Sequence, residues 1–339
     1  MVLTLVWFQA EFLSVRIPYD ISVNLFYGTR YGAWLLLGPL YYYYVRTITG
    51  EKPDLKILVL HFLPFALFWL ILPLLTTEMV GKQQVHYGML STFYPFIEGM
   101  QKLQYVYAAL FAGQFLHVFV YLLISLRNIN RYERTLKGNF SKIDTTTILW
   151  LKTLSVLFMF VVAFVTIFLA LFFINRSYDR NLDYLYVMPM AILTYLISYK
   201  LAGVEWTTGP VEEKSTKYER TALKPETAIG IRKQLEGYMA DSKPYLNNEL
   251  RLHDLAEQLS VPSHHLSQVI NDQLGLSFFD YVNKYRVEEA KRLIISEPNG
   301  TMLEIAFKAG FNNKTSFSNA FKKFTTQTAV EFKKQQTPR

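Results

Sequence analysis

The chain has 339 residues, of which 54 are aromatic, and a formal net charge of +8. It contains no cysteine, which excludes disulfides, cysteine-ligated zinc, iron–sulfur clusters and a thiol nucleophile. Residues 1–202 hold 40 of the aromatic side chains but only 26 charged ones, whereas residues 203–339 hold 36 charged side chains. Few single soluble domains combine these values, so we interpret the chain as an apolar half followed by a charged half of ordinary soluble composition.

The apolar half predicts a polytopic transmembrane helical domain over residues 1–202. Glu11 interrupts the first apolar residues before they complete a span, so we expect five or six spans. Lysine and arginine are enriched in the loops 46–56 and 127–149 relative to the alternate loops, which places these two loops and everything after Lys200 in the cytoplasm. Three of the predicted spans have the length that a bilayer requires and two are shorter; together they are 31–45, 57–75, 103–126, 153–175 and 184–199.

Three polar side chains stand alone inside the predicted spans: His61, Gln114 and His117. Two interpretations remain open. Such residues most often hydrogen-bond a neighbouring helix, but they are also candidates for a membrane sensor site. No carboxylate accompanies them and no metal-ligand or protease spacing appears in the spans, so we expect no metal, no cofactor and no catalytic residue.

The charged half begins with a polar segment, 203–227, whose Gly-Pro and Lys-Pro pairs predict a linker. From Ala228 onward the apolar spacing is helical, and we expect a domain over 228–339. A long helix over 277–295 separates two similar pairs of short helices, at about 250–271 and about 302–324. Short helices joined by a tight turn are the helix-turn-helix arrangement.

The two helix pairs share their turn chemistry. Ala306 and Gly310 stand four residues apart, as Ala256 and Ser260 do, and the second turn is one residue longer than the first. Ser263 is expected to be the N-cap of the second helix of the first pair.

The second helix of each pair has one apolar stripe and one polar face. The residues 308–339 carry seven basic side chains against one acidic side chain, which favours contact with DNA phosphates. Amide side chains can pair with adenine and lysine with guanine, and two such units about 34 Å apart would enter successive major grooves. The candidate DNA-binding residues are Ser263, His264, Ser267, Gln268, Asn271, Lys314, Thr315, Ser316, Ser318, Asn319, Lys322 and Lys323.

These residues carry a resemblance. The segment 245–334 resembles the DNA-binding domain of the AraC/XylS family of bacterial transcription regulators, in which one long helix joins two helix-turn-helix units. The strongest match is IAFKAGFNNKTSFSNAFKKFTTQTAVEF at 305–332. Thr326 and Ala329 stand where the family usually has glycine and proline, which would loosen a terminal turn. Asn319 replaces a frequent arginine and would alter affinity or sequence preference.

The apolar half resembles the membrane domain of a subset of these regulators that is typical of the Bacteroidota. The matching stretches are LLLGPLYYYYVR at 35–46, LHFLPF at 60–65 and the basic loop after Leu126. Such relatives usually have about seven spans, so Met1 is expected to fall within the second one. Either the chain is a short variant or its start is assigned late.

Taken together, the sequence predicts an all-α, membrane-bound, sequence-specific transcription regulator that is not an enzyme. We expect it to be multi-pass in the inner (cytoplasmic) membrane with its DNA-binding domain in the cytoplasm. The expected partners are double-stranded DNA, the lipid bilayer, a small-molecule or protein signal and a second copy in a homodimer. Two alternatives remain: a membrane enzyme or transporter with a DNA-binding or regulatory tail, and a non-sensing membrane anchor for DNA. Loss of residues 1–202 would change regulation by signal in a sensor, but only the location of an anchor.

Overall fold

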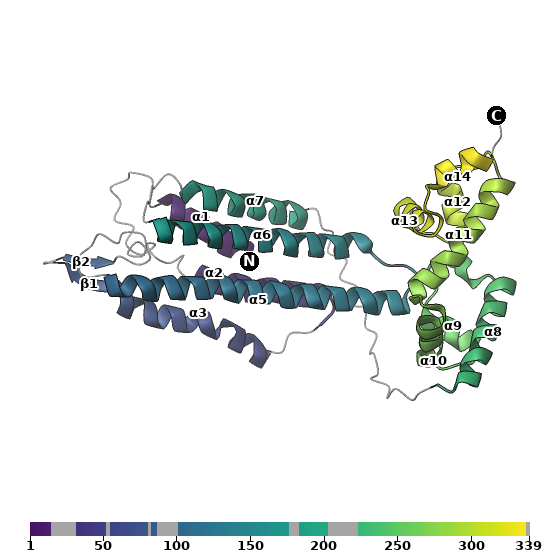
Figure 1. Ribbon diagram of the computed structural model, residues 1–339, viewed down its shortest axis with the longest axis horizontal. Coiled ribbons are helices and arrows are strands. Elements are labelled where there is room, and N and C mark those ends of the chain that lie inside the picture. Colours follow the sequence, from purple (N-terminus) through teal and green to yellow (C-terminus); the bar gives the residue numbers. More distant parts are fainter. Residues whose placement is uncertain are drawn as a thin grey trace. The chain divides into compact units, whose positions relative to one another are not determined.

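The computed structural model describes residues 1–14, 32–51, 55–80, 83–86, 101–175, 183–202 and 223–336. This part of the chain is helical except for one antiparallel hairpin, β1 Thr77–Val80 and β2 Gln83–His86, in which Thr77 pairs with His86 (Figure 1). The other elements of the described residues are all helices, so the all-α prediction is confirmed apart from this short hairpin. The hairpin forms where the apolar helical run of residues 55–76 ends, and its strands contain three β-branched residues, Thr77, Val80 and Val85, a residue type that suits paired strands.

The chain forms two compact units whose boundaries do not follow the simple halves of the sequence. One unit comprises Met1–Asn130 and Thr146–Glu213, and the other comprises Arg131–Thr145 and Lys214–Arg339. The connector between helix α5, Gln101–Asn139, and helix α6, Thr145–Asn175, therefore belongs to the same unit as the charged half. The predicted linker is shorter than expected at its end, because helix α8 already begins at Pro225, while residues 203–222 lie outside the described residues.

Long helices make up the first unit. Polar contacts join neighbouring helices: the Gln9 amide donates to the Thr194 hydroxyl at 2.8 Å, and the Tyr41 hydroxyl lies 2.6 Å from that of Ser155. Such bonds are the usual polar contacts between helices in a bilayer. The helices are α1 Val2–Ser14, α2 Ala33–Ile48, α3 Leu55–Thr76, α5 Gln101–Asn139, α6 Thr145–Asn175 and α7 Asp183–Ala202 (Figure 1).

Two described helical stretches, Ala112–Asn139 and Thr145–Phe168, are long and apolar enough to cross a membrane. They lie on α5 and α6, where two of the spans were predicted. Shorter apolar helical stretches occur at Val2–Leu13, Ile57–Leu70 and Val187–Lys200. A buried core helix of a soluble protein also has this length and composition, so the polytopic membrane domain stays a prediction.

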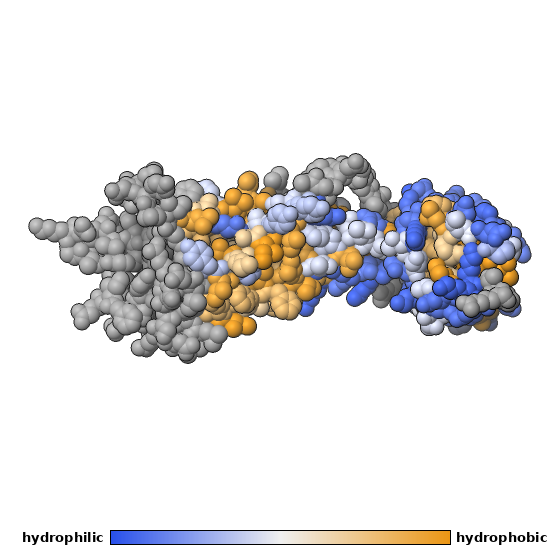
Figure 2. Space-filling model, turned by 90° about the horizontal axis from the view of Figure 1, so that it is seen from above, coloured by the Kyte–Doolittle hydropathy of each residue, from blue (hydrophilic) through white to orange (hydrophobic). Residues whose placement is uncertain are grey.

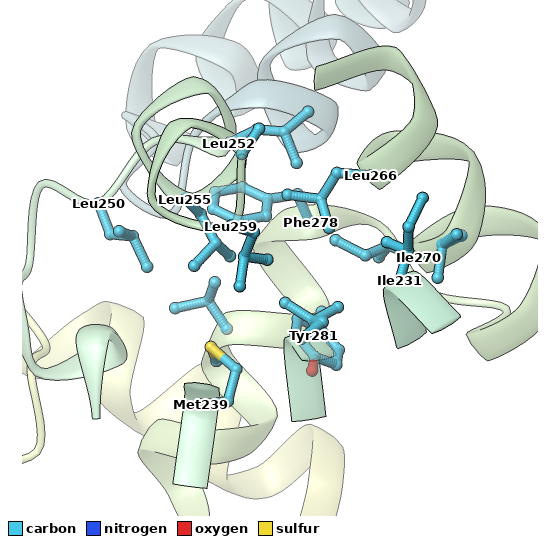
Figure 3. Close-up of a cluster of buried hydrophobic side chains, with 14 of the residues drawn as sticks. Ile231, Met239, Leu250, Leu252, Leu255, Leu259, Leu266, Ile270, Phe278 and Tyr281 are labelled. Carbon is cyan, nitrogen blue, oxygen red and sulfur yellow. The ribbon is translucent and has the colours of Figure 1, made fainter. Parts of the chain in front are cut away.

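The second unit begins with a core that packs the first pair of short helices against α8. Its elements are α8 Pro225–Asp241, the 3₁₀ turn η2 Pro244–Leu246, α9 Leu252–Gln258, α10 Ser263–Gln268 and the π-helical turn η3 Val269–Gln273. Figure 3 shows side chains from α8, α9, α10 and η3 converging, among them Leu255, Leu266 and Ile270, which are at most 1% exposed. The 3.6-residue spacing of these apolar positions explains why the helices form and which faces they bury.

A second core packs the other pair of short helices. Its elements are the C-terminal part of α11 Phe278–Ser296, α12 Met302–Lys308, α13 Lys314–Thr325 and α14 Ala329–Gln336. Phe317, Ala320 and Phe321 of α13 are buried, as predicted, and Phe324 is partly buried. Because α11 contributes to both cores, it fixes the two helix pairs on one rigid element.

Both short-helix pairs have a residue with left-handed backbone conformation at the equivalent position of the turn. Ser260 has φ +54° and Gly310 has φ +89°, and the following amides of Val261 and Phe311 donate to the carbonyls of Ala256 and Ala306. This is the Schellman ending of a helix, so the predicted equivalence of the two turns is confirmed. Thr326, at the position expected to loosen a turn, also adopts a left-handed conformation with φ +62°.

Gly310 is constrained by space as well as by backbone angle. A Cβ atom at this position would lie 2.4 Å from the Tyr245 carbonyl oxygen and 2.9 Å from Leu246 Cα, both backbone atoms that cannot rotate away. We expect Gly310→Ala to destabilise the second unit by about 2–4 kcal/mol, through left-handed strain and overpacking.

Tryptophan fluorescence does not report on the second core, because all the tryptophans lie within residues 1–206. The measurement is therefore amide hydrogen exchange of residues 302–336 in the full-length chain. The matched control is Gly237→Ala, whose added Cβ meets nothing within 4 Å in the helix α8. This control is expected to be neutral or stabilising by up to about 1 kcal/mol. Equal protection in the two variants would contradict the assigned packing of Gly310.

Candidate nucleic-acid interface

The first recognition-type helix is α10, continued by η3. Leu266, Val269 and Ile270 are buried, as the sequence predicted. The predicted polar face is accessible: Asn271 is exposed, and the other members, Ser263, His264, Ser267 and Gln268, are partly exposed. The structure therefore brings all five candidates of this helix onto its accessible side.

The start of α10 differs from the prediction. Pro262, not Ser263, occupies the N-cap position, because its backbone angles of φ −60° and ψ 135° already have the extended conformation of a cap. Ser263 is the first helical residue, and its hydroxyl lies 3.3 Å from Nδ1 of His253. The serine hydroxyl is thus tied to the first helix of the pair rather than to a free backbone amide of α10.

Two local contacts order the exposed side of α10 and η3. The Asn271 amide donates to the Ser267 hydroxyl at 3.2 Å, across one turn. The rings of His264 and His265 are 4.2 Å apart at their centroids, and burial together with the neighbouring His264 lowers the pKa of His265. A lowered pKa favours the neutral ring at neutral pH, in which one nitrogen donates and the other accepts hydrogen bonds.

The second recognition-type helix is α13. The Asn313 side-chain oxygen accepts a hydrogen bond from the Ser316 amide at 2.7 Å and so caps the helix. Lys314 lies in the first turn, where the helix dipole disfavours a cation and favours a bound anion. This lysine is therefore better placed to hold a phosphate or base acceptor than to stabilise the helix. The exposed candidates of this helix are Lys314, Thr315, Ser318, Asn319, Lys322 and Lys323, and Ser316 is partly exposed.

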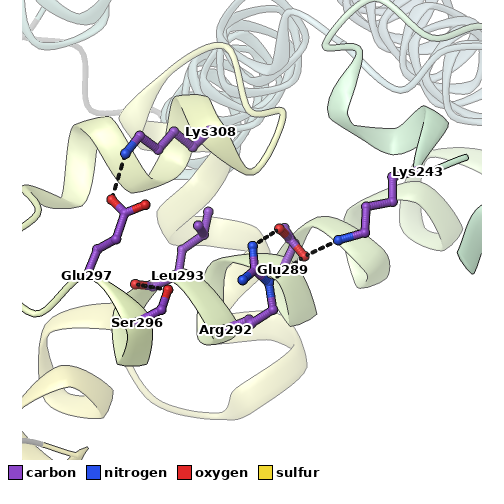
Figure 4. Close-up of polar contacts among 7 residues, drawn as sticks. All are labelled: Lys243, Glu289, Arg292, Leu293, Ser296, Glu297 and Lys308. Carbon is purple, nitrogen blue, oxygen red and sulfur yellow. Dashed lines mark hydrogen bonds and ion pairs between the residues drawn. The ribbon is translucent and has the colours of Figure 1, made fainter. Parts of the chain in front are cut away.

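The lysines near the C-terminus are not equivalent. Lys323 Nζ lies 2.6 Å from the Asp280 carboxylate of α11, whereas Lys322 makes no ion pair with the described residues. Lys308 pairs with Glu297 at 2.6 Å (Figure 4), and Lys333 donates to the Gly300 carbonyl at 2.9 Å. Arg339, counted in the basic excess, lies outside the described residues. Among the described lysines of the candidate face, Lys314 and Lys322 are thus the two that make no ion pair.

A second ion cluster lies on α11 and contains none of the candidate DNA-binding residues. The Glu289 carboxylate forms ion pairs with Nη2 of Arg292, at 2.6 Å, and with Nζ of Lys243, at 3.4 Å (Figure 4). Its hydrogen bond with Arg292, aided by the charge of Lys243, lowers the pKa of the Glu289 carboxyl. These contacts join η2 to α11, so we assign them to the packing of the unit and not to DNA.

Sequence reasoning missed Arg286, which is only 2% exposed in the middle of α11. Its Nε donates to the Tyr245 carbonyl at 2.7 Å and its Nη2 donates to the Asn247 carbonyl at 2.8 Å. The available signal was its position, because Val282 and Ala290, four residues away on either side, are both buried. A basic residue on the inward stripe of a helix indicates a buried polar network.

The polar residues predicted inside the spans are partly brought together. Nδ1 of His61 on α3 hydrogen-bonds the Tyr121 hydroxyl of α5, and the His117 ring lies 4.8 Å from the Tyr121 ring. Gln114 is only 1% exposed, and neither atom of its amide group has a hydrogen-bond partner among the described residues. His61 therefore fits the helix-pairing interpretation, while Gln114 keeps the sensor interpretation open.

Comparison with known proteins assigns the C-terminal region. Residues 255–335 match a family model described as a helix-turn-helix domain. An HTH-type transcriptional regulator of Staphylococcus aureus (strain COL) is 33% identical over 89 residues, covering 26% of this chain and 12% of the relative. The regulator YtdP of Bacillus subtilis (strain 168) is 31% identical over 88 residues, covering 26% of this chain and 11% of the relative. The chain thus spans about an eighth of the length of these relatives or less.

Two solved structures are each similar to about one third of the chain. A protein from Listeria innocua is 25% identical, with a TM-score of 0.28, and covers 32% of this chain and 98% of its own. The C-terminal domain of AraT, a response regulator from Geobacillus stearothermophilus, is 28% identical, with a TM-score of 0.29, and covers 35% of this chain and 92% of its own.

The family match and the two helix pairs agree with the predicted resemblance. The C-terminal region of the chain is an AraC-type helix-turn-helix domain. The resemblance of the apolar half to a membrane domain stays a prediction.

The different surroundings of Lys322 and Lys323 give a direct test of the interface. We expect Lys322→Gln to weaken DNA binding and to reduce the slope of log affinity against log salt by about 0.9, since one phosphate contact is lost. Lys323→Gln should change the slope less, because Asp280 already neutralises this ammonium. The measurement is duplex affinity of the purified chain across a salt series. Equal slopes for the two variants would remove the distinction drawn between the neighbouring lysines.

Proposed function

We propose that the chain is a membrane-bound, sequence-specific DNA-binding transcription regulator, in which a signal received by the transmembrane helices changes gene expression. The observation that carries this proposal is the pairing of two helix-turn-helix units on the single helix α11, each with its polar recognition face accessible. A helix-turn-helix domain implies DNA binding, and its relatives are HTH-type transcriptional regulators.

The chemistry of the two faces supports different roles on DNA, with base reading by α10 and both phosphate and base contacts by α13. The α10 face offers neutral donors and acceptors, Gln268 and Asn271 among them, which suit reading of base edges. The α13 face adds Lys314 and Lys322 to Asn319, so that it combines phosphate contacts with base contacts. Two units of unlike charge on one helix would bind an asymmetric site, with the stronger electrostatic term at the α13 end.

The exposed surface of the first unit supports a place in the bilayer. Large apolar side chains are exposed on several helices, including Leu60 (64%) and Leu70 (70%) on α3, Leu116 (65%) on α5 and Phe160 (72%) on α6. Figure 2 shows such hydrophobic side chains gathered over the helices of the first unit, whereas the second unit is largely hydrophilic. Exposed apolar areas of this extent are costly in water and favourable in lipid.

The polar side chains between these helices support a role in sensing. Buried polar groups normally have hydrogen-bond partners, and those that lack them require a reason. The buried amide of Gln114, one turn from His117 on α5, is such a group among the described residues. A small polar ligand that hydrogen-bonds this amide would act directly on α5. The sensor residues we propose are therefore Gln114, His117 and His61, and a homodimer remains a prediction from sequence.

Sequence recognition is tested with the purified full-length chain and duplexes selected from a random library. We expect salt-dependent binding and a preference for the selected duplex over a scrambled one. His264→Ala, Gln268→Ala and Lys314→Ala should each reduce this preference by about 1–3 kcal/mol, because each removes a base-edge contact. The matched control is Lys233→Ala, which removes an exposed lysine of α8 outside both helix pairs. Binding without any sequence preference at low salt would refute the proposed recognition.

Membrane topology is tested by labelling single cysteines, since the natural chain has none. A membrane-impermeant maleimide should label Lys82→Cys and Arg180→Cys in intact spheroplasts, where the alternate loops are predicted to face outward. Lys137→Cys and Lys233→Cys should react only after permeabilisation. Both outward positions lie outside the described residues, so this test rests on the sequence. Recovery of the chain in the soluble fraction, or a reversed labelling pattern, would contradict the proposed localisation.

A further inference from the structure

The connector between α5 and α6 is bound within the DNA-binding unit. Phe140 forms an antiparallel bridge with Arg251, the residue that precedes α9. The Ser141 amide and hydroxyl both donate to the Leu250 carbonyl, at 3.2 and 2.6 Å, and Ser141 is 2% exposed. Lys142 pairs with Glu249 at 3.0 Å. Three consecutive residues of the connector thus pair with residues 249–251, the segment just before the first helix-turn-helix pair.

The deepest contact of the connector is with Arg286. Nη1 of Arg286 donates to the Ser141 carbonyl at 3.1 Å, and Nη2 donates to the Ser141 hydroxyl at 3.2 Å. The remaining acceptors are the carbonyls of Tyr245 and Asn247 and, at 3.4 Å, the Asn283 side chain. All these acceptors are neutral. A buried cation without a carboxylate depends on each of its hydrogen bonds, and the connector supplies two of them.

The Arg286 site lies where the two helix-turn-helix units meet. Tyr245 and Leu250 belong to the first core, whereas Phe311, whose ring centre is 5.9 Å from the Arg286 guanidinium carbon, belongs to the second. Gly310, next to Phe311, packs against the Tyr245 carbonyl. A segment that completes the hydrogen bonds of Arg286 therefore bears on the contact between the two cores and on the relative position of α10 and α13.

We propose that residues 131–145 are an intramolecular docking segment for the Arg286 site, and that their docking holds the two helix-turn-helix units in the arrangement that binds DNA. The partner of this surface is thus a segment of the same chain, joined directly to α5 and α6. The effect on DNA rests on the function proposed above, whereas docking itself does not. Release of Ser141 would leave two donors of a buried guanidinium without acceptors and would loosen the junction.

Docking is tested by a disulfide in the otherwise cysteine-free, full-length chain in lipid nanodiscs. Residues paired across an antiparallel bridge have Cα atoms about 4.5–5.5 Å apart, within the range that a disulfide spans. Phe140→Cys/Arg251→Cys should therefore form an intramolecular disulfide readily under mild oxidation. The control Arg134→Cys/Arg251→Cys, with its first cysteine about 9 Å further along α5, should not. Absence of the first disulfide in the folded chain would overturn the docking.

The effect on DNA is tested with the same pair and with variants of the segment. The oxidised Phe140→Cys/Arg251→Cys chain should bind the selected duplex at least as tightly as its own reduced form. The variant Ser141→Tyr places a tyrosine ring at a position that is only 2% exposed, where the ring cannot fit, and it should therefore release the segment from Arg286. We expect the affinity for the selected duplex to fall about tenfold or more, because hydrogen bonds to a charged group are lost. Thr145→Tyr, at an exposed position of the same segment, should stay within about twofold.

The possible failures are distinguishable. Hydrogen exchange of residues 302–336 shows whether Ser141→Tyr leaves the second core folded. If the disulfide forms but Ser141→Tyr leaves the affinity unchanged, or oxidation weakens DNA binding, the segment does not hold the arrangement that binds DNA and its control of DNA binding is overturned. If the unmodified chain shows no sequence preference, the proposed function fails and the regulatory role fails with it, whereas the disulfide result still decides docking.

Discussion

The arrangement of the DNA-binding unit depends on one buried guanidinium. Arg286 is charged at neutral pH even though burial lowers its pKa to about 10. Removing an ion from water costs several kcal/mol, and Arg286 makes no ion pair with a carboxylate of the described residues that would offset this cost. The offset comes from neutral oxygens on three separate stretches of chain, around residues 141, 245–247 and 283. Each stretch is held in place by its hydrogen bonds with the guanidinium group, since losing one would leave a buried donor without an acceptor.

This constraint explains why the two similar helix pairs differ at their junction. Both turns require a left-handed residue, and the first tolerates Ser260, which is exposed. The second turn has Gly310, because the backbone of Tyr245 and Leu246 approaches too closely for any Cβ. The same Tyr245 carbonyl that contacts Gly310 accepts the hydrogen bond of Arg286. One carbonyl therefore ties the second turn, η2 and α11 together, and the docked connector completes the group.

The sequence predicted what is local and missed what joins distant segments. The helices of the second unit, their inward stripes and the longer second turn follow from apolar spacing and turn residues such as Ala306 and Gly310. The cap of α10 was assigned to Ser263 because side-chain capping is common, but the fixed backbone of Pro262 decides the helix start. The hairpin after α3 and the connector contact at Ser141 depend on pairing between segments, which periodicity does not encode. The accessible faces of α10 and α13 agree with the predicted candidates, while the pairing of Lys323 with Asp280 needed the structure.

The short connector gives the docking contact its mechanical meaning. Only residues 140–144 lie between the end of α5 at Asn139 and the start of α6 at Thr145. A stretch this short has little slack, so a shift or rotation of either helix must be taken up at Phe140, Ser141 or Lys142. A signal can change DNA binding through this route only if it binds the docked and released arrangements with different affinity. A polar ligand at Gln114 meets this condition only if it favours a position of α5 that also favours one of the two states of Ser141, docked on Arg286 or released from it. The physical question for the whole chain is therefore whether ligand contact with α5 and hydrogen bonding to Arg286 favour the same position of that helix.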